Sequence, residues 1–106
     1  MNRAWWMLTV AGILEVVWAI GLKSSDGFRK PGIATFTVMA MIASFYFLAQ
    51  ALKTLPVGTG YVVWTGIGAV GTAIVGIVVF GESREAARIA SIGLIVAGIV
   101  GLKLSG

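Results

Sequence analysis

The sequence predicts an all-α integral membrane protein in which each chain contributes four transmembrane helices. Of the 106 residues, 58% are hydrophobic and only 11% are charged, a composition too apolar for an ordinary soluble domain. Glycine is abundant, with 15 residues against two prolines, and small residues let membrane helices pack closely. The strict alternation of polar and apolar residues that marks the strands of a membrane barrel does not occur.

Short polar connections separate the four predicted spans, so residues 1–106 are expected to form a single domain. The connections are KSSDGFRKP, KTLP and GESRE, which are rich in charge, Gly and Pro. Each apolar segment approaches the roughly 20 residues that cross a hydrocarbon core of about 30 Å. An even number of spans predicts that both termini lie on the same side of the membrane. The spans cover residues 4–22, 32–52, 57–80 and 86–102.

Basic residues are divided almost evenly between the two ends of this predicted bundle. Three lie on the side of the termini and five on the opposite side. Because basic loops favour the cytoplasm, this small imbalance predicts a weak orientation preference, including a mixture of both insertions. These residues form no stripe, so lipid headgroups are the expected partner rather than nucleic acid. The three are Arg3, Lys53 and Lys103, and the five are Lys23, Arg29, Lys30, Arg84 and Arg88.

One carboxylate, Glu15, interrupts the first span near its middle, within the segment GILEVVWAIG. A charge at mid-bilayer costs about 2.5–3.5 kcal/mol on insertion scales, so such a residue usually faces a cavity and takes part in transport. The alternative is a permanently protonated acid that bonds to a neighbouring helix. Gly12 and Ala19 share the face of Glu15 at helical spacing, with Trp18 beside them, which predicts a groove of small residues next to the acid.

Side chains on the second and third spans are candidates to complete a site around this acid. Met41 and Ser44 share one face, and the Ser44 hydroxyl has two options: a bond across the bundle or one within its own helix. Tyr61 and Trp64, three residues apart, combine hydrogen-bond donors with aromatic faces that attract a cation. An interfacial aromatic belt is the alternative interpretation for this pair.

Small residues in the last two spans indicate close helix contacts. In the fourth span, Gly93, Ala97 and Gly101 recur every four residues, a ridge typical of helix association in membranes. We interpret this ridge as a self-association surface, with a contact inside the fold as the alternative. In the third span, a row of glycines favours either tight packing or a bend. This row is Gly66, Gly68, Gly71 and Gly76.

Several motifs spread over essentially the whole chain resemble those of one known family. They are EVVWAIGLK in the first span and the segment ASFYFLAQALKTLPVGTGYVVWTGIG, which includes a TLP turn and a Tyr-x-x-Trp-x-Gly-x-Gly pattern. This is the small multidrug resistance family, and specifically its guanidinium-exporter subtype. The resemblance implies an antiparallel, dual-topology homodimer in the bacterial cytoplasmic membrane. It further implies that Glu15 of both copies binds protons or substrate, that Trp18 and Ser44 orient it, and that Tyr61 and Trp64 complete the site.

Details of the sequence bear on the substrate that the resemblance implies. Family members that export bulky drugs usually have a small residue in place of Trp18, which favours the guanidinium subtype, and Gly12 would leave room beside the acid. Gly60 and Val62 stand where that subtype often has alanine, a departure that affects the pose of Tyr61. Guanidinium is planar and offers pairs of N–H donors that match a carboxylate, whereas quaternary ammonium relies on aromatic faces.

These features predict a proton-coupled antiporter that exports guanidinium and small guanidinyl cations by alternating access. In this hypothesis two like carboxylates in a poorly hydrated cavity hold protons when it is empty, and a cation displaces them. The alternatives are an exporter of quaternary ammonium or other hydrophobic cations, and a non-transporting subunit whose acid fixes helix assembly. We expect no enzymatic activity, cofactor or metal. The expected partners are the cation, protons, membrane lipid and a second copy of the chain.

Overall fold

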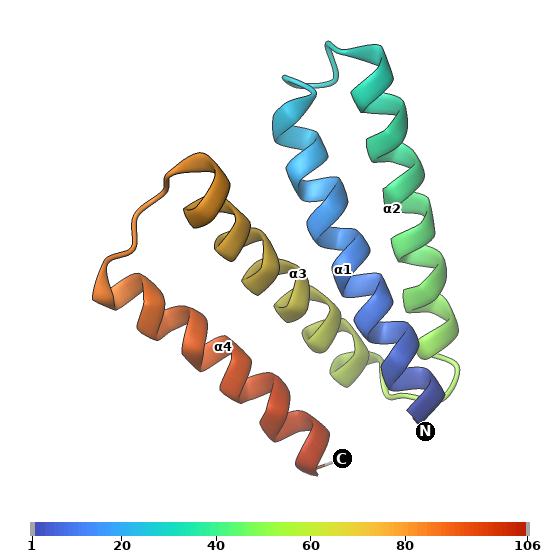
Figure 1. Cartoon of the computed structure of the whole chain (residues 1–106). Helices are drawn as coiled ribbons and strands as arrows, with labels where there is room; N and C mark the ends of the chain where they lie inside the picture. Colours follow the sequence, from blue (N-terminus) through green and yellow to red (C-terminus); the bar gives the residue numbers. More distant parts are fainter. Residues whose placement is uncertain (1, 106) are drawn as a thin grey trace.

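Four long α-helices make up the structure, a computed structural model that describes residues 2–105 (Figure 1). All four are long and apolar enough to cross a membrane, and the described residues contain no strand. The prediction of an all-α protein with four membrane-spanning helices is confirmed. The helices begin and end within three residues of the predicted spans. They are α1 (Asn2–Ser24), α2 (Pro31–Ala51), α3 (Val57–Phe80) and α4 (Ala86–Ser105).

Proline and glycine set several of the helix ends. Pro31 occupies the first turn of α2, where the missing N–H leaves no hydrogen bond unmade and the fixed φ suits a helix. Pro56 directly precedes α3. At the other end of α3, Gly81 adopts a left-handed conformation with φ 67°, and the N–H of Glu82 donates to the carbonyl of Gly76 at 3.1 Å. This turn folds the chain back toward α3 before α4 begins.

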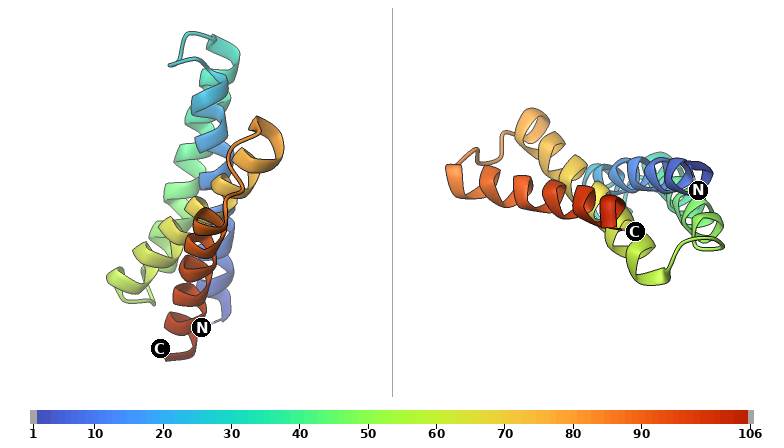
Figure 2. Two further views of the ribbon diagram at one scale, coloured as in Figure 1. Left: turned by 90° about the vertical axis from the view of Figure 1, so that its left-hand side faces the viewer. Right: turned by 90° about the horizontal axis from the view of Figure 1, so that it is seen from below.

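The helices form a thin layer rather than a closed bundle. α1 packs along α2 and crosses α3, and α4 packs on α3 alone (Figures 1 and 2). Both termini lie at one end of the molecule, and the α1–α2 and α3–α4 connections lie at the other. The molecule measures 41 × 35 × 17 Å along its principal axes. Since one helix with its side chains is about 10–12 Å across, the thinnest direction holds fewer than two full helix diameters.

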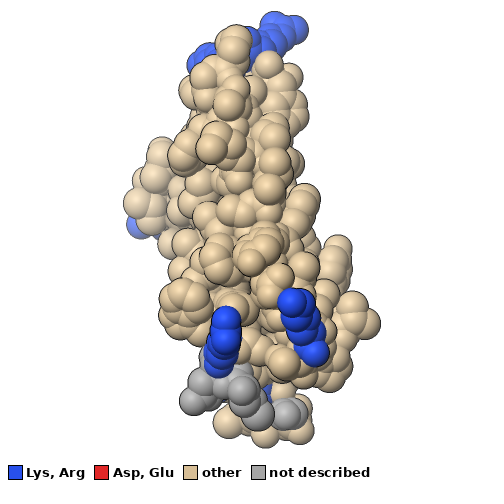
Figure 3. Space-filling view, turned by 90° about the vertical axis from the view of Figure 1, so that its right-hand side faces the viewer, with Lys and Arg blue, Asp and Glu red and all other residues tan. Residues whose placement is uncertain are grey.

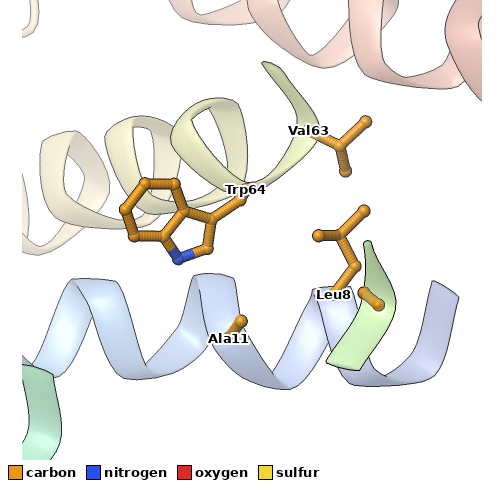
Figure 4. Close-up of a cluster of buried hydrophobic side chains, with 5 residues drawn as sticks. Leu8, Ala11, Val63 and Trp64 are labelled. Carbon is orange, nitrogen blue, oxygen red and sulfur yellow. The ribbon is translucent and has the colours of Figure 1, made fainter. Parts of the chain in front are cut away.

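A small apolar core lies where α1, α2 and α3 meet near the terminal end (Figure 4). Elsewhere many large apolar side chains are exposed, and α4 has no buried residue. In a bilayer such faces contact lipid or another helix. Figure 3 shows one such face, largely uncharged, with most of the visible Lys and Arg side chains toward its two ends. The core consists of Leu8, Ala11, Ala51, Val63 and Trp64.

Candidate functional site

Glu15 lies in the middle of α1 and faces α3. It lies nine positions before Ser24, the last residue of α1, which corresponds to about 14 Å along the helix. The residue is partly buried, and its Oε1 atom is buried without a hydrogen-bond partner among the described residues. Its neighbour on α3 is Gly68, where an added Cβ would collide with the carboxylate. The missing side chain of Gly68 therefore lets α3 approach the acid.

The glycine row of α3 lies at tight contacts with neighbouring elements. α3 is one uninterrupted helix from Val57 to Phe80. An added Cβ at any of the four glycines would lie closer than 3.0 Å to a neighbouring side chain, so each glycine sits at a close approach. The neighbours of Gly66, Gly68, Gly71 and Gly76 are Ile99, Glu15, Val16 and Glu82, respectively.

A cavity of 390 Å³ extends from Glu15 to the end of the molecule opposite the termini. α1 and α3 supply most of its wall and α2 supplies none, while Glu82 and Arg88 line its outer end. Two hydroxyl-bearing residues, Thr65 and Thr72, lie on either side of the glycine that faces the acid. The lining comprises Glu15, Ala19, Ile20, Lys23, Thr65, Gly68, Ala69, Thr72, Ala73, Gly76, Phe80, Glu82 and Arg88.

A buried chain of hydrogen bonds joins three helices beside this cavity. The Ser44 hydroxyl of α2 donates to the carbonyl of Ala11 on α1 at 2.7 Å. The indole Nε1 of Trp64 on α3 donates to the same hydroxyl at 3.0 Å. Ser44 thus bonds across the bundle and not within its own helix, and Trp64, only 7% exposed, is packed inside the chain. These two hydrogen bonds hold the indole of Trp64 one helical turn from Gly68, the glycine that contacts Glu15.

Aromatic rings form a continuous series next to these hydrogen bonds, edge-to-face from Trp18 to Trp64 and tilted at Tyr61. The ring centroids of Trp18 and Phe45 lie 6.3 Å apart, those of Phe45 and Trp64 lie 5.8 Å apart, and those of Tyr61 and Trp64 lie 5.5 Å apart. Trp18 also carries a buried Nε1 without a hydrogen-bond partner among residues 2–105. The Trp18 indole therefore has an unused hydrogen-bond donor, and the ring faces carry the negative charge density that attracts cations. Sequence reasoning missed Phe45, which links the two tryptophans.

None of the six residues predicted to line a site with Glu15 belongs to the wall of its cavity. They are Gly12, Trp18, Met41, Ser44, Tyr61 and Trp64. An added Cβ at Gly12 would meet Ile67, so this glycine lies at the contact between α1 and α3. Met41 is partly buried on α2 but is absent from the cavity wall. Tyr61, 56% exposed, lines a second, apolar cavity of 560 Å³ between α3 and α4. Thr65 lines both cavities and connects the two regions.

The small-residue ridge of α4 points away from the rest of the chain. Gly93, Ala97 and Gly101 are all exposed, and an added Cβ at either glycine would meet no atom within 4 Å. The opposite face of α4, which includes Ile95 and Ile99, lines the cavity shared with α3. The ridge therefore makes no contact inside this fold.

Comparison with known proteins places the chain in one family. Residues 3–95 match the Small Multidrug Resistance protein family. The chain belongs to the small multidrug resistance family. A member from Yersinia pseudotuberculosis, named guanidinium exporter, is 62% identical over 102 residues, covering 96% of this chain and 98% of the relative. A Citrobacter freundii protein with the same name is 60% identical, covering 96% and 97%.

As a member of the small multidrug resistance family with four membrane-spanning helices, the chain is an integral membrane protein. Sequence reasoning for this family member missed the outer cavity wall. Thr72 follows Thr65 by seven residues, two helical turns on the same face of α3, so a signal was present in the spacing. No local pattern in the sequence indicated that Glu82 or Arg88 belongs to the cavity wall, because only the turn at Gly81 brings the α3–α4 connection over α3.

Proposed function

We propose that the protein is a proton-coupled antiporter of the bacterial cytoplasmic membrane that exports guanidinium and small guanidinyl cations. The Glu15 carboxylate carries the proposal, because its Oε1 atom is buried without a hydrogen-bond partner among the described residues and because the residue lines an open-ended cavity. An unsatisfied buried acceptor costs about 1–3 kcal/mol, and a cation with N–H donors relieves that cost. Relatives named guanidinium exporter, up to 62% identical, support this choice of cation.

The proposed active form is a dimer of oppositely inserted copies that share one site. A single chain is 17 Å thick at its thinnest, and its cavity is walled mainly by α1 and α3, so a second copy is needed to enclose a cation. The outward ridge of Gly93, Ala97 and Gly101 suits contact between copies, because small residues let helices approach closely. The near-even division of basic residues supports insertion in both orientations.

In the proposed cycle, protons and the cation compete for the two Glu15 carboxylates. The planar cation offers pairs of N–H donors along its edges, so two carboxylates on opposite sides hold it. Ser44 and Trp64, held by the hydrogen bonds to the Ala11 carbonyl, keep the aromatic wall in place next to the acid. Protons that arrive from outside displace the cation there, and the dimer alternates which side it opens to.

A second candidate function is export of quaternary ammonium or other hydrophobic cations. The edge-to-face series that includes Trp18, Phe45 and Trp64 favours it, because aromatic faces bind cations that lack N–H donors. A third hypothesis is a non-transporting subunit whose acid fixes helix assembly. It predicts that neutralising Glu15 leaves any flux unchanged.

Flux measurements in reconstituted liposomes separate these functions. Wild type is expected to move guanidinium against a pH gradient faster than it moves a tetraalkylammonium ion, and Glu15→Gln is expected to reduce this flux at least about 100-fold, because glutamine neither ionises nor exchanges protons. Glu85→Gln, which neutralises an exposed acid outside the cavity wall, is the matched control and should retain wild-type flux. Equal guanidinium flux in wild type and Glu15→Gln would refute the proposal.

A further inference from the structure

We propose that Glu82 forms a second, outer binding site for guanidinium-type cations, and that the side chain of Arg88 occupies this site when no substrate is bound. The inference rests on the proposed function and extends it, because Glu82 would bind the cation first, between solvent and Glu15. Both acids line the same cavity, so a cation that leaves Glu82 inward reaches Glu15 without crossing another helix.

The backbone holds the Glu82 carboxylate over the mouth of the cavity. The left-handed turn at Gly81 and the hydrogen bond from the Glu82 N–H to the Gly76 carbonyl, 3.1 Å long, bring the residue back onto α3. Its Oε1 atom would lie 2.5 Å from a Cβ at Gly76. Gly76 therefore leaves room for the outer carboxylate just as Gly68, two turns deeper, leaves room for Glu15.

The group that Glu82 holds is itself a guanidinium. Nη2 of Arg88 donates to Oε1 of Glu82 at 2.6 Å. This contact has the chemistry that the proposed substrate requires, a planar cation whose N–H meets a carboxylate oxygen. The carboxylate thus already accepts, from within the chain, the functional group that it would accept from solution.

The contact with Arg88 is weak enough for a substrate to replace it. The two side chains are 34% and 42% exposed, and an ion pair accessible to water is favoured over its open state by at most about fivefold. The pair is then open for at least about one sixth of the time, so an arriving cation can reach a free Glu82. No rearrangement of the helices is required.

Because of the charges at the mouth of the cavity, a substrate cation and the Arg88 side chain cannot both occupy the outer site. Besides Glu82 and Arg88, the mouth contains Lys23, whose Nζ atom lies 5.2 Å from the centre of the Phe80 ring. One acid thus faces two bases, and a third cation is repelled unless Arg88 moves away. Removing the charge of Glu82 should then weaken substrate capture, whereas removing the charge of Arg88 should strengthen it. An ion pair with only a structural role would be lost equally in both variants and would produce shifts of the same sign.

The test is the KM for guanidinium uptake into proteoliposomes at low ionic strength. We expect Glu82→Gln to raise KM about fivefold and Arg88→Gln to lower it by a similar factor, the equivalent of about 1 kcal/mol. Glu85→Gln and Arg84→Gln are the controls. They likewise remove one negative and one positive charge, respectively, at exposed residues near Glu82 and Arg88 but outside the cavity wall. They should leave KM unchanged.

Shifts of the same sign in Glu82→Gln and Arg88→Gln, or no shift in either, would overturn the outer site. Poor folding is distinguishable, because both variants break the same ion pair and a folding defect would lower Vmax in both without moving KM in opposite directions. Wild-type transport with an unaffected KM in both variants refutes the outer site and leaves the proposed function standing. Absence of guanidinium transport by wild type refutes both.

Discussion

Gly68→Ala is expected to disable the site while the protein remains folded. The added Cβ would collide with the Cγ, Cδ and Oε1 atoms of Glu15. Because those atoms belong to a flexible side chain, the carboxylate should turn away before α3 moves. Alanine also favours a helix over glycine by up to about 1 kcal/mol, which offsets part of the about 1–3 kcal/mol typical of overpacking.

The expected weakening of cation binding in Gly68→Ala follows from the hydrogen bond between the cation and Glu15 that would be lost. A hydrogen bond between a cation and a carboxylate contributes about 1.5–3 kcal/mol, so displacement of the acid should weaken cation binding about 10- to 100-fold. We expect this factor in the KM for guanidinium uptake into proteoliposomes. The elution volume of the detergent-solubilised protein should match that of wild type.

Gly58→Ala provides the matched control in the same helix. An added Cβ there meets no atom within 4 Å, so this variant adds the same methyl group to α3 without the collision, and its KM should equal that of wild type. If Gly68→Ala transported guanidinium with the wild-type KM, Glu15 would not face Gly68 in the state that binds the cation. That result would refute the reasoning from this close approach.

Further predictions concern the hydrogen bonds of α2 and the ridge of α4. Ser44→Ala leaves the buried Nε1 of Trp64 without an acceptor and should lower the free energy of unfolding in detergent by about 1–3 kcal/mol, whereas Ser91→Ala at an exposed site should change it by less than about 0.5 kcal/mol. Trp64→Phe should cost about 1 kcal/mol less in the Ser44→Ala background than in wild type, because the lost donor matters only where its acceptor is present, and equal costs in both backgrounds would contradict a direct bond. Ala97→Leu should reduce the yield of crosslinked dimer because it separates the helices, and an undiminished yield would place the contact on another face.

The fold was predictable because the thickness of the bilayer limits the possible answers. A run of about 20 apolar residues has few alternatives to a spanning helix, and Pro31 and Gly81 mark helix ends that hold in the structure. Glu15 was conspicuous for a related reason, since an acid in the middle of an apolar span is costly. Its role in binding remains a prediction.

The rest of the site depended on long-range geometry that no local pattern encodes. For Ser44 a bond within the helix and a bond across the bundle are locally equivalent, and only the approach of Ala11 decides between them. Phe45 is one of many apolar residues in its helix and becomes distinctive only between two tryptophans. Glu82 resembled an ordinary loop acid, because its position over Gly76 depends on how the chain turns after α3.

The peripheral place of α4 separates two kinds of recognition within one small protein. Apart from Arg88 near its start, α4 contributes nothing to the wall around Glu15, and its outward stripe touches nothing else in the chain. In the proposed dimer, the contact through α4 and the Glu15 cavity therefore lie on different surfaces of each chain. Substitutions on the outward stripe of α4 would then change the contact between copies and leave the wall around Glu15 intact.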